Sequence, residues 1–247
     1  MDRINELVEK AETYMHQLPE KAAPGVIPSG KELAGWIDHT LLKAEATEEQ
    51  IIKLCQEAVE HHFAAVCVNP VYLPLVRGQL QGTQVGICTV VGFPLGALSG
   101  SMKALEALQC MEEGASEIDM VMNIGALKGH AYGQVLNDTW AVAEVVHRQE
   151  AILKVILETA SLTQFEKIIA CLLAEAAGAD FVKTSTGFGA GGATVEDVAL
   201  MYRVVETRVR VKAAGGIRSR EDALAMIRAG ASRLGTSAGV KILEGAA

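Results

Sequence analysis

Three lysines interrupt apolar segments whose composition is typical of buried strands: Lys154, Lys183 and Lys212. Their positions are 29 residues apart each time, the length of one strand-helix repeat, so successive strands can carry them into one cavity. Burial disfavours the charged form of a lysine, and a second cation nearby disfavours it further. Because a neutral amine attacks carbonyl carbons, these residues predict a Schiff-base enzyme.

Acidic residues accompany the lysines. Asp119 lies inside the apolar segment 117–122, Asp38 lies near the end of the first such segment, and Glu158 follows the fifth. A carboxylate beside an ammonium group can hold it in place and relay the protons that imine formation requires. The structural alternative is that the carboxylates are plain ion-pair partners and that the lysines extend to solvent. Three lysines in register favour the functional interpretation.

From residue 33 onward, short apolar or β-branched segments alternate with longer segments of helical periodicity. The predicted strands span residues 35–40, 64–68, 85–91, 117–122, 152–157, 180–184, 209–213 and 233–235. The predicted helices include residues 47–61, 101–113, 131–148, 163–177, 195–205 and 220–229. In a chain of 247 residues this order predicts an α/β fold, a (β/α)8 TIM barrel, with an open doubly wound sheet as the alternative.

Local signals mark several helix ends. The segment Thr47-Glu48-Glu49-Gln50 is a capping-box pattern at the start of a helix. Gly114, Gly178 and Gly230 each follow a predicted helix and precede a strand, where glycine can adopt the left-handed conformation that ends a helix.

An amphipathic segment precedes the barrel. Apolar residues recur at helical spacing between residues 2 and 18, and a segment containing proline and glycine follows. We therefore divide the chain into an N-terminal helix and linker, residues 1–29, and a barrel domain, residues 30–247. The apolar stripe of the helix must be covered by the barrel itself or by a second subunit, so a homodimer or a tetramer is expected.

Glycine-rich segments follow the last three predicted strands, at residues 187–192, 215–217 and 235–239. In TIM barrels, phosphate is commonly bound by the loops after strands seven and eight at a helix N-terminus. Glycine pairs also form tight turns in other α/β proteins. Their placement here predicts a phosphorylated small-molecule substrate.

Composition excludes several other classes of protein. The net charge of −8 and the lack of a long basic run argue against nucleic-acid binding. The five cysteines form no CxxC pair, which indicates reduced core thiols, and the six histidines show no compact metal-ligand spacing. Neither a signal peptide nor an apolar run long enough for a membrane span is present, so a cytoplasmic location is expected.

Five polar segments occur in order along the barrel: Asp38-His39-Thr40-Leu41-Leu42-Lys43, Cys67-Val68-Asn69-Pro70, Glu117-Ile118-Asp119, Lys183-Thr184-Ser185-Thr186-Gly187-Phe188 and Lys212-Ala213-Ala214-Gly215-Gly216-Ile217-Arg218. Together they resemble the corresponding segments of the deoxyribose-phosphate aldolase family. The resemblance extends from about residue 30 to the end of the chain and implies a class I aldolase.

The resemblance implies reversible cleavage of 2-deoxy-D-ribose 5-phosphate to glyceraldehyde 3-phosphate and acetaldehyde, with no metal or other cofactor. By motif, Lys183 is the Schiff-base lysine, Lys212 is the neighbouring cation that favours its neutral form, and Asp119 is the proton donor and acceptor. The residues alone do not choose Lys183 over Lys212. The resemblance also implies a set of substrate-binding positions: Asp38, Thr40, Cys67, Lys154, Gly187, Gly216, Gly235 and Ser237.

The chain departs from the family pattern at two places. Phe188 stands where some members have a lysine, which removes one contact to phosphate. The last residues are Gly245-Ala246-Ala247, whereas some members have a C-terminal tyrosine that reaches the site. Two alternatives remain open at this point: another Schiff-base phosphosugar aldolase, and a non-catalytic phosphate-binding or assembly protein on the same fold.

Overall fold

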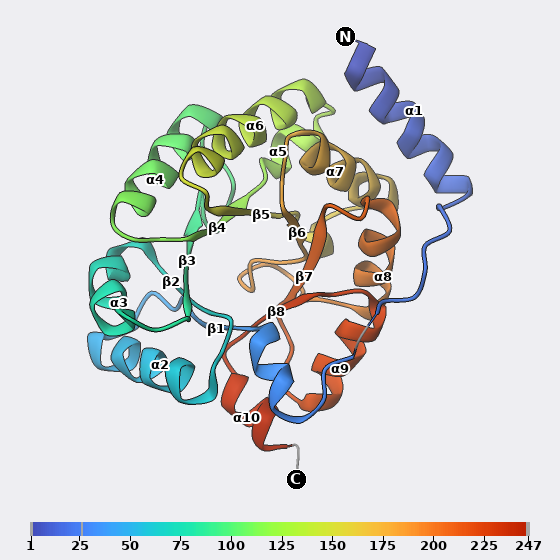
Figure 1. Cartoon of the computed structure of the whole chain (residues 1–247). Coiled ribbons are helices and arrows are strands. Elements are labelled where there is room, and N and C mark those ends of the chain that lie inside the picture. Colours follow the sequence, from blue (N-terminus) through green and yellow to red (C-terminus); the bar gives the residue numbers. More distant parts are fainter. Residues whose placement is uncertain (1, 26, 246–247) are drawn as a thin grey trace.

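A closed barrel of eight parallel strands forms the centre of the computed structural model, which describes residues 2–25 and 27–245. Each strand pairs with the next, and β8 pairs with β1 to close the sheet (Figure 1). The strands are β1 Ile37–Leu41, β2 Ala65–Val68, β3 Gly86–Val91, β4 Glu117–Val121, β5 Ile152–Ile156, β6 Phe181–Lys183, β7 Arg210–Ala214 and β8 Arg233–Thr236. The predicted TIM barrel is therefore confirmed, and the open doubly wound alternative is wrong.

Helices surround the barrel on its outer side (Figure 1). They are α1 Asp2–His16, α2 Glu48–His61, α3 Leu73–Leu80, α4 Gly100–Glu112, α5 Ile124–Lys128, α6 Tyr132–Arg148, α7 Gln164–Ala176, α8 Val195–Val204, α9 Arg220–Ala229 and α10 Gly239–Glu244. The capping box at Thr47 is present. Gly114, Gly178 and Gly230 all have positive φ, as the helix-end pattern predicts.

The structure differs from the predicted elements in two respects. The first strand begins at Ile37 rather than residue 35, because Gly30–Trp36 forms a 3₁₀ helix that leads into it. The short helices α3 and α5 were not predicted. Leu73–Leu80 contains a proline and a glycine, and Ile124–Lys128 has only 5 residues, so neither segment shows a full helical period.

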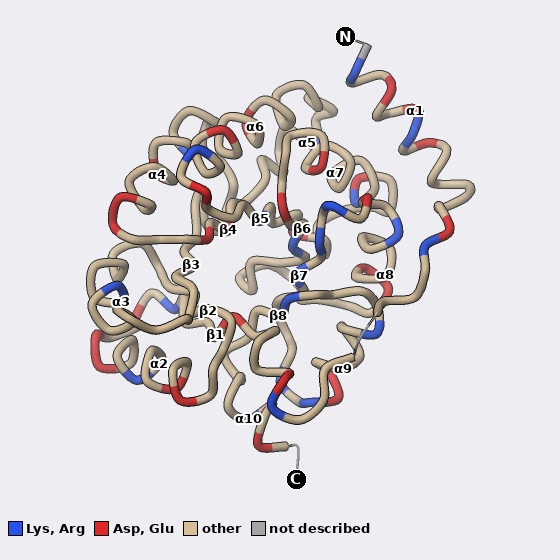
Figure 2. Tube along the Cα trace, viewed as in Figure 1, with Lys and Arg blue, Asp and Glu red and all other residues tan. Residues whose placement is uncertain are grey.

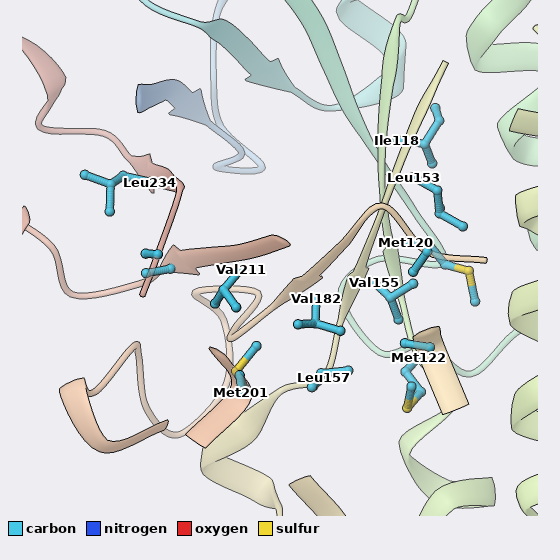
Figure 3. Packing of buried hydrophobic residues seen from close by; sticks show 14 of the residues in the cluster. Ile118, Met120, Met122, Leu153, Val155, Leu157, Val182, Met201, Val211 and Leu234 are labelled. Carbon is cyan, nitrogen blue, oxygen red and sulfur yellow. The ribbon is translucent and has the colours of Figure 1, made fainter. Parts of the chain in front are cut away.

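Alternate strand residues face opposite sides of the barrel wall. Residues facing outward pack against the helices and are apolar, among them Ile118, Leu153, Val182 and Leu234, all fully buried (Figure 3). Their neighbours in sequence face the interior of the barrel. This second set includes the ionisable residues that interrupt the apolar segments.

The N-terminal extension packs on its own barrel. Helix α1 lies against α7, and its Ala11 is fully buried (Figure 1). Arg3 donates to the carbonyl of Ala176 over 2.6 Å, and Lys21 donates to the carbonyls of Tyr202 and Val205 over 2.8 Å each. Of the two covers expected for the apolar stripe, the barrel's own surface is the one observed.

The five cysteines are all buried and free, as expected for reduced core thiols. No helix within residues 2–25 and 27–245 combines the length and the apolar character needed to cross a membrane. The comparison of the C-terminal tail with family members that end in tyrosine includes Ala246 and Ala247. These two residues lie outside the described residues.

Candidate active site

The carboxylate of Asp119 on β4 is the centre of an ion cluster inside the barrel. Lys183 and Lys212 each donate to its Oδ2 over 2.8 Å, and Lys154 donates to its Oδ1 over 2.8 Å. All four side chains are almost completely buried. Figure 2 shows basic residues on β6 and β7 near the centre of the barrel. The structure thus brings the three predicted lysines and Asp119 together.

Strand register aligns two of the three lysines. Lys183 on β6 pairs with Lys212 on β7, so these two occupy equivalent positions. Lys154 on β5 pairs with Phe181, two residues before Lys183, so Lys154 is out of register with the other two lysines. The prediction that all three lysines occupy equivalent positions is wrong for Lys154, because equal spacing in sequence does not fix the stagger between two strands.

Asp38 on β1 extends the cluster. Its Oδ2 accepts a hydrogen bond from Lys212, and its Oδ1 accepts one from Arg233 over 2.5 Å. Arg233 also donates to Glu117 over 2.5 Å, and Glu117 contacts Lys154 at 2.6 Å. The interior of the barrel is therefore a continuous ion network.

Burial and charge act in opposite directions on this network. Burial by itself raises the pKa of Asp119, but Lys154, Lys183 and Lys212 outweigh that effect and hold the pKa well below its usual range. Burial likewise raises the pKa of Asp38, and Lys212, Arg233 and Lys154 bring it down to about 2. Burial lowers the pKa of Lys212, but Asp119 and Asp38 outweigh this effect and raise the pKa above its ordinary value. Lys212 therefore stays protonated.

A cavity of about 390 Å³ opens at the carboxyl ends of the strands. Of the sequence-predicted residues, six line it: Thr40, Lys183, Gly187, Gly216, Gly235 and Ser237. Five lie outside this lining and are buried: Asp38, Cys67, Asp119, Lys154 and Lys212. Among the three lysines of the described cluster, Lys183 alone reaches the cavity, which distinguishes it physically from Lys212.

Two cations at the mouth of this cavity were not singled out from sequence. Lys43 follows β1 and Arg218 follows the glycine pair after β7, and both are exposed and line the cavity. The sequence could have pointed to both, because Lys43 and Arg218 are the last residues of two of the five segments that resemble the family. Arg233 and Glu117 were also missed, although each is an ionisable residue in a strand, the criterion that identified the lysines.

The glycine-rich loops meet at one side of the cavity. Ala193 donates its backbone N–H to the carbonyl of Gly215 over 3.0 Å. A Cβ on Gly192 would lie 2.3 Å from that same carbonyl oxygen, so the close approach of the two loops requires glycine there. Backbone groups of both loops therefore border the space next to Arg218.

Glu158 does not join the lysines. Its Oε2 accepts the backbone N–H of Thr186 over 2.9 Å, which fixes the loop that lines the cavity. Phe188 in the same loop is 53% exposed and packs edge-on against Phe93, with the ring centroids 5.3 Å apart. The cavity wall at this point is thus aromatic.

Potential metal ligands also lie in the barrel. Donor atoms of Cys67, Cys88 and Asp119 lie within 4.8 Å of one another. Both oxygens of Asp119 already accept hydrogen bonds from ammonium groups. The donor set therefore suits cationic side chains better than a metal ion, because a bound ion would face the lysines at short range.

Comparison with known proteins identifies the family. The model of the DeoC/LacD family aldolases matches residues 33–245. The chain belongs to this aldolase family. The deoxyribose-phosphate aldolase of Thermococcus kodakarensis is 57% identical over 218 residues, which cover 87% of this chain and 97% of the relative. That of Carboxydothermus hydrogenoformans is 56% identical over 219 residues, covering 88% and 96%.

Solved structures of similar proteins share the fold of this aldolase. A protein from Coccidioides immitis superimposes with a TM-score of 0.91 at 46% identity and covers 98% of this chain and 96% of its own. The deoxyribose phosphate aldolase from Aeropyrum pernix has a TM-score of 0.82 at 32% identity, with coverage of 97% and 96%. The family predicted from the five motifs is confirmed. Because the family is one of aldolases, the alternative of a non-catalytic protein is wrong.

Acid titration of stability tests the ion network of this aldolase. The folded pKa of Asp38, about 2, lies below its ordinary value of 3.8, so the carboxylate contributes stability that is present above pH 4 and lost as the pH falls toward 2. We expect the difference in unfolding free energy between the wild-type protein and Asp38→Asn to shrink by about 2 kcal/mol between pH 5 and pH 2. Urea denaturation measures it, and a constant difference would contradict the network.

Proposed function

We propose that this aldolase reversibly cleaves 2-deoxy-D-ribose 5-phosphate to glyceraldehyde 3-phosphate and acetaldehyde through an imine on Lys183. One observation carries the proposal: the Lys183 amine borders the open cavity and also contacts the buried carboxylate of Asp119 over 2.8 Å. A nucleophile needs access to substrate and a proton relay within hydrogen-bond reach, and this lysine has both. The 57%-identical relative bears the name of this activity.

The chemistry follows from these contacts. The neutral Lys183 amine attacks the C1 aldehyde carbon of the open-chain sugar, and uptake of a proton with loss of water gives a protonated imine. The imine nitrogen withdraws the electron pair of the C2–C3 bond while the C3 hydroxyl loses its proton, which releases glyceraldehyde 3-phosphate. Protonation of the remaining enamine at C2 and hydrolysis release acetaldehyde and restore the amine.

Asp119 and Lys212 are suited to the proton transfers. Asp119 Oδ2 lies 2.8 Å from both Lys183 Nζ and Lys212 Nζ, so a proton can pass between the amine and the carboxylate without a large movement. Lys212 remains charged, and its charge favours the neutral form of the adjacent amine. Lys154, held by Asp119 and Glu117, positions the carboxylate from the other side.

The phosphate group is assigned to the opposite end of the cavity. Gly187, Gly216, Gly235 and Ser237 offer backbone and hydroxyl donors, and Arg218 adds a guanidinium suited to a phosphate. Lys43 supplies a second positive charge at the mouth. Phe188 supplies an apolar wall instead of the lysine of some family members, so the phosphate relies on Arg218, Lys43 and the glycine loops.

Trapping of the imine tests the catalytic assignment. Incubation with acetaldehyde and sodium borohydride should add one ethyl group to the protein, and peptide mapping should place it on Lys183. Lys183→Met should remove the adduct, while Lys128→Met, a change on the outer surface, should keep it. An adduct on Lys212 or Lys154 would overturn the assignment of Lys183 but keep the class of enzyme. Analysis of the products formed from 2-deoxyribose 5-phosphate separately tests the proposed substrate.

Comparison of two substrates tests the phosphate site. Arg218→Met should raise the KM for 2-deoxyribose 5-phosphate by about ten- to a hundredfold, because one charge-assisted hydrogen bond to phosphate contributes about 1.5–3 kcal/mol. The kcat/KM for unphosphorylated 2-deoxyribose should change by less than about twofold. Equal losses with both sugars would place Arg218 outside the phosphate site.

We also propose that the enzyme works in the cytoplasm as a homo-oligomer, with the dimer as the basic unit. The Aeropyrum pernix relative forms a tetramer. Helices α4 and α6 expose the large apolar side chains of Met102, Leu105 and Trp140, which a second subunit would cover. Sedimentation equilibrium should give a mass of twice or four times 26.2 kDa, and a monomer mass would contradict this proposal.

A further inference from the structure

Arg233 is a buried cation that the mechanism above does not use. It lies on β8, its side chain is 12% exposed, and it points into the barrel beside Lys212, its register partner. Its Nε donates to Asp38 Oδ1 and its Nη2 to Glu117 Oε1, both over 2.5 Å. A guanidinium remains charged under all conditions in which proteins fold. Arg233 is therefore a permanent positive charge in the ion network.

The second oxygen of each carboxylate that Arg233 contacts faces a lysine. Asp38 Oδ2 accepts from Lys212, and Glu117 Oε2 lies 2.6 Å from Lys154. Arg233 thus shares both carboxylates with the two lysines that do not reach the cavity. Each of these lysines also contacts Asp119 at 2.8 Å.

Counting charges shows an imbalance within the described residues. Besides Lys183, the titratable groups of this interior network are Asp38 on β1, Cys67 on β2, Cys88 on β3, Glu117 and Asp119 on β4, Lys154 on β5, Lys212 on β7 and Arg233 on β8. If the carboxylates, the lysines and the arginine were ionised and both thiols were neutral, three carboxylates would face four cations, Lys183 included. An excess charge in a poorly solvated interior is costly. The excess therefore weighs most on the cation with the fewest carboxylate contacts.

Lys183 is the lysine of the network with the fewest carboxylate contacts. It contacts one carboxylate oxygen, which it shares with Lys212, whereas Lys212 and Lys154 each contact further carboxylates. It also borders the cavity, from which water can exchange its proton. We propose that Arg233 is a positioning residue that sets the charge balance of the barrel interior and so keeps the Lys183 amine available as a neutral nucleophile. This inference rests on the proposed imine function.

The test is the pH dependence of kcat/KM for cleavage of 2-deoxyribose 5-phosphate. Because the neutral amine is the reactive form, the acidic limb of the profile reports its protonation. Arg233→Met removes the excess positive charge and should move this limb to higher pH by about one unit. Arg233→Lys keeps the charge and should leave the limb in its wild-type position.

A charge change of opposite sign provides a second variant. Glu117→Gln removes one negative charge and should move the limb to lower pH. The double variant Arg233→Met with Glu117→Gln restores the wild-type balance and should return the limb to near its wild-type pH, even if both changes reduce kcat. Arg148→Met, at an exposed position on α6, is the matched control and should leave the whole profile unchanged.

The outcomes separate the two proposals. If the wild-type protein forms the borohydride-trapped adduct but neither Arg233→Met nor Glu117→Gln moves the limb, Arg233 has only a structural role and this inference fails. The inference would also be overturned if the acidic limb moved in the same direction in Arg233→Met and in Glu117→Gln. If the wild-type protein forms no adduct, the proposed function itself fails. Should Arg233→Met not fold, Glu117→Gln still tests the charge balance, because an acidic limb that stays at its wild-type pH in this variant would overturn the inference.

Discussion

The shared carboxylate of Asp119 is the interaction on which the rest of the site depends. An isolated ion in the interior of a protein is very costly, so each buried charge must lie within contact of an opposite one. Three ammonium groups meet at the two oxygens of Asp119. A shift of β4 by one residue would turn this side chain toward the apolar layer. The ion contacts of Asp119 can therefore form only in the observed register of β4.

The barrel wall separates two environments that alternate along each strand. On the outer side, Ile118 and Met120 flank Asp119 in sequence and pack under the helices. Inside the barrel, a small apolar cluster of Leu42, Ala65, Cys67, Cys88 and Val90 occupies the side formed by β1, β2 and β3. The charged residues are thereby confined to the remaining interior, where low polarity strengthens their interactions.

Lys183 lies at the boundary between this dry interior and the open cavity. It ends the short strand β6 and precedes the loop whose Thr186 is held by Glu158. The groups proposed to bind phosphate lie in loops, while the groups proposed to react lie on strands. This division gives the chemistry rigid positions and leaves the recognition of substrate to segments that can adjust.

The sequence by itself determined the barrel and its element order, and it singled out the ionisable residues inside apolar strands, because periodicity and such interruptions are local signals. Only the tertiary structure decided that Lys183 reaches the cavity while Lys212 and Lys154 do not. It also revealed Arg233, whose partners Asp38 and Glu117 are far away in sequence. Strand stagger and barrel closure fix these relations, and neither is encoded in the spacing of residues along the chain.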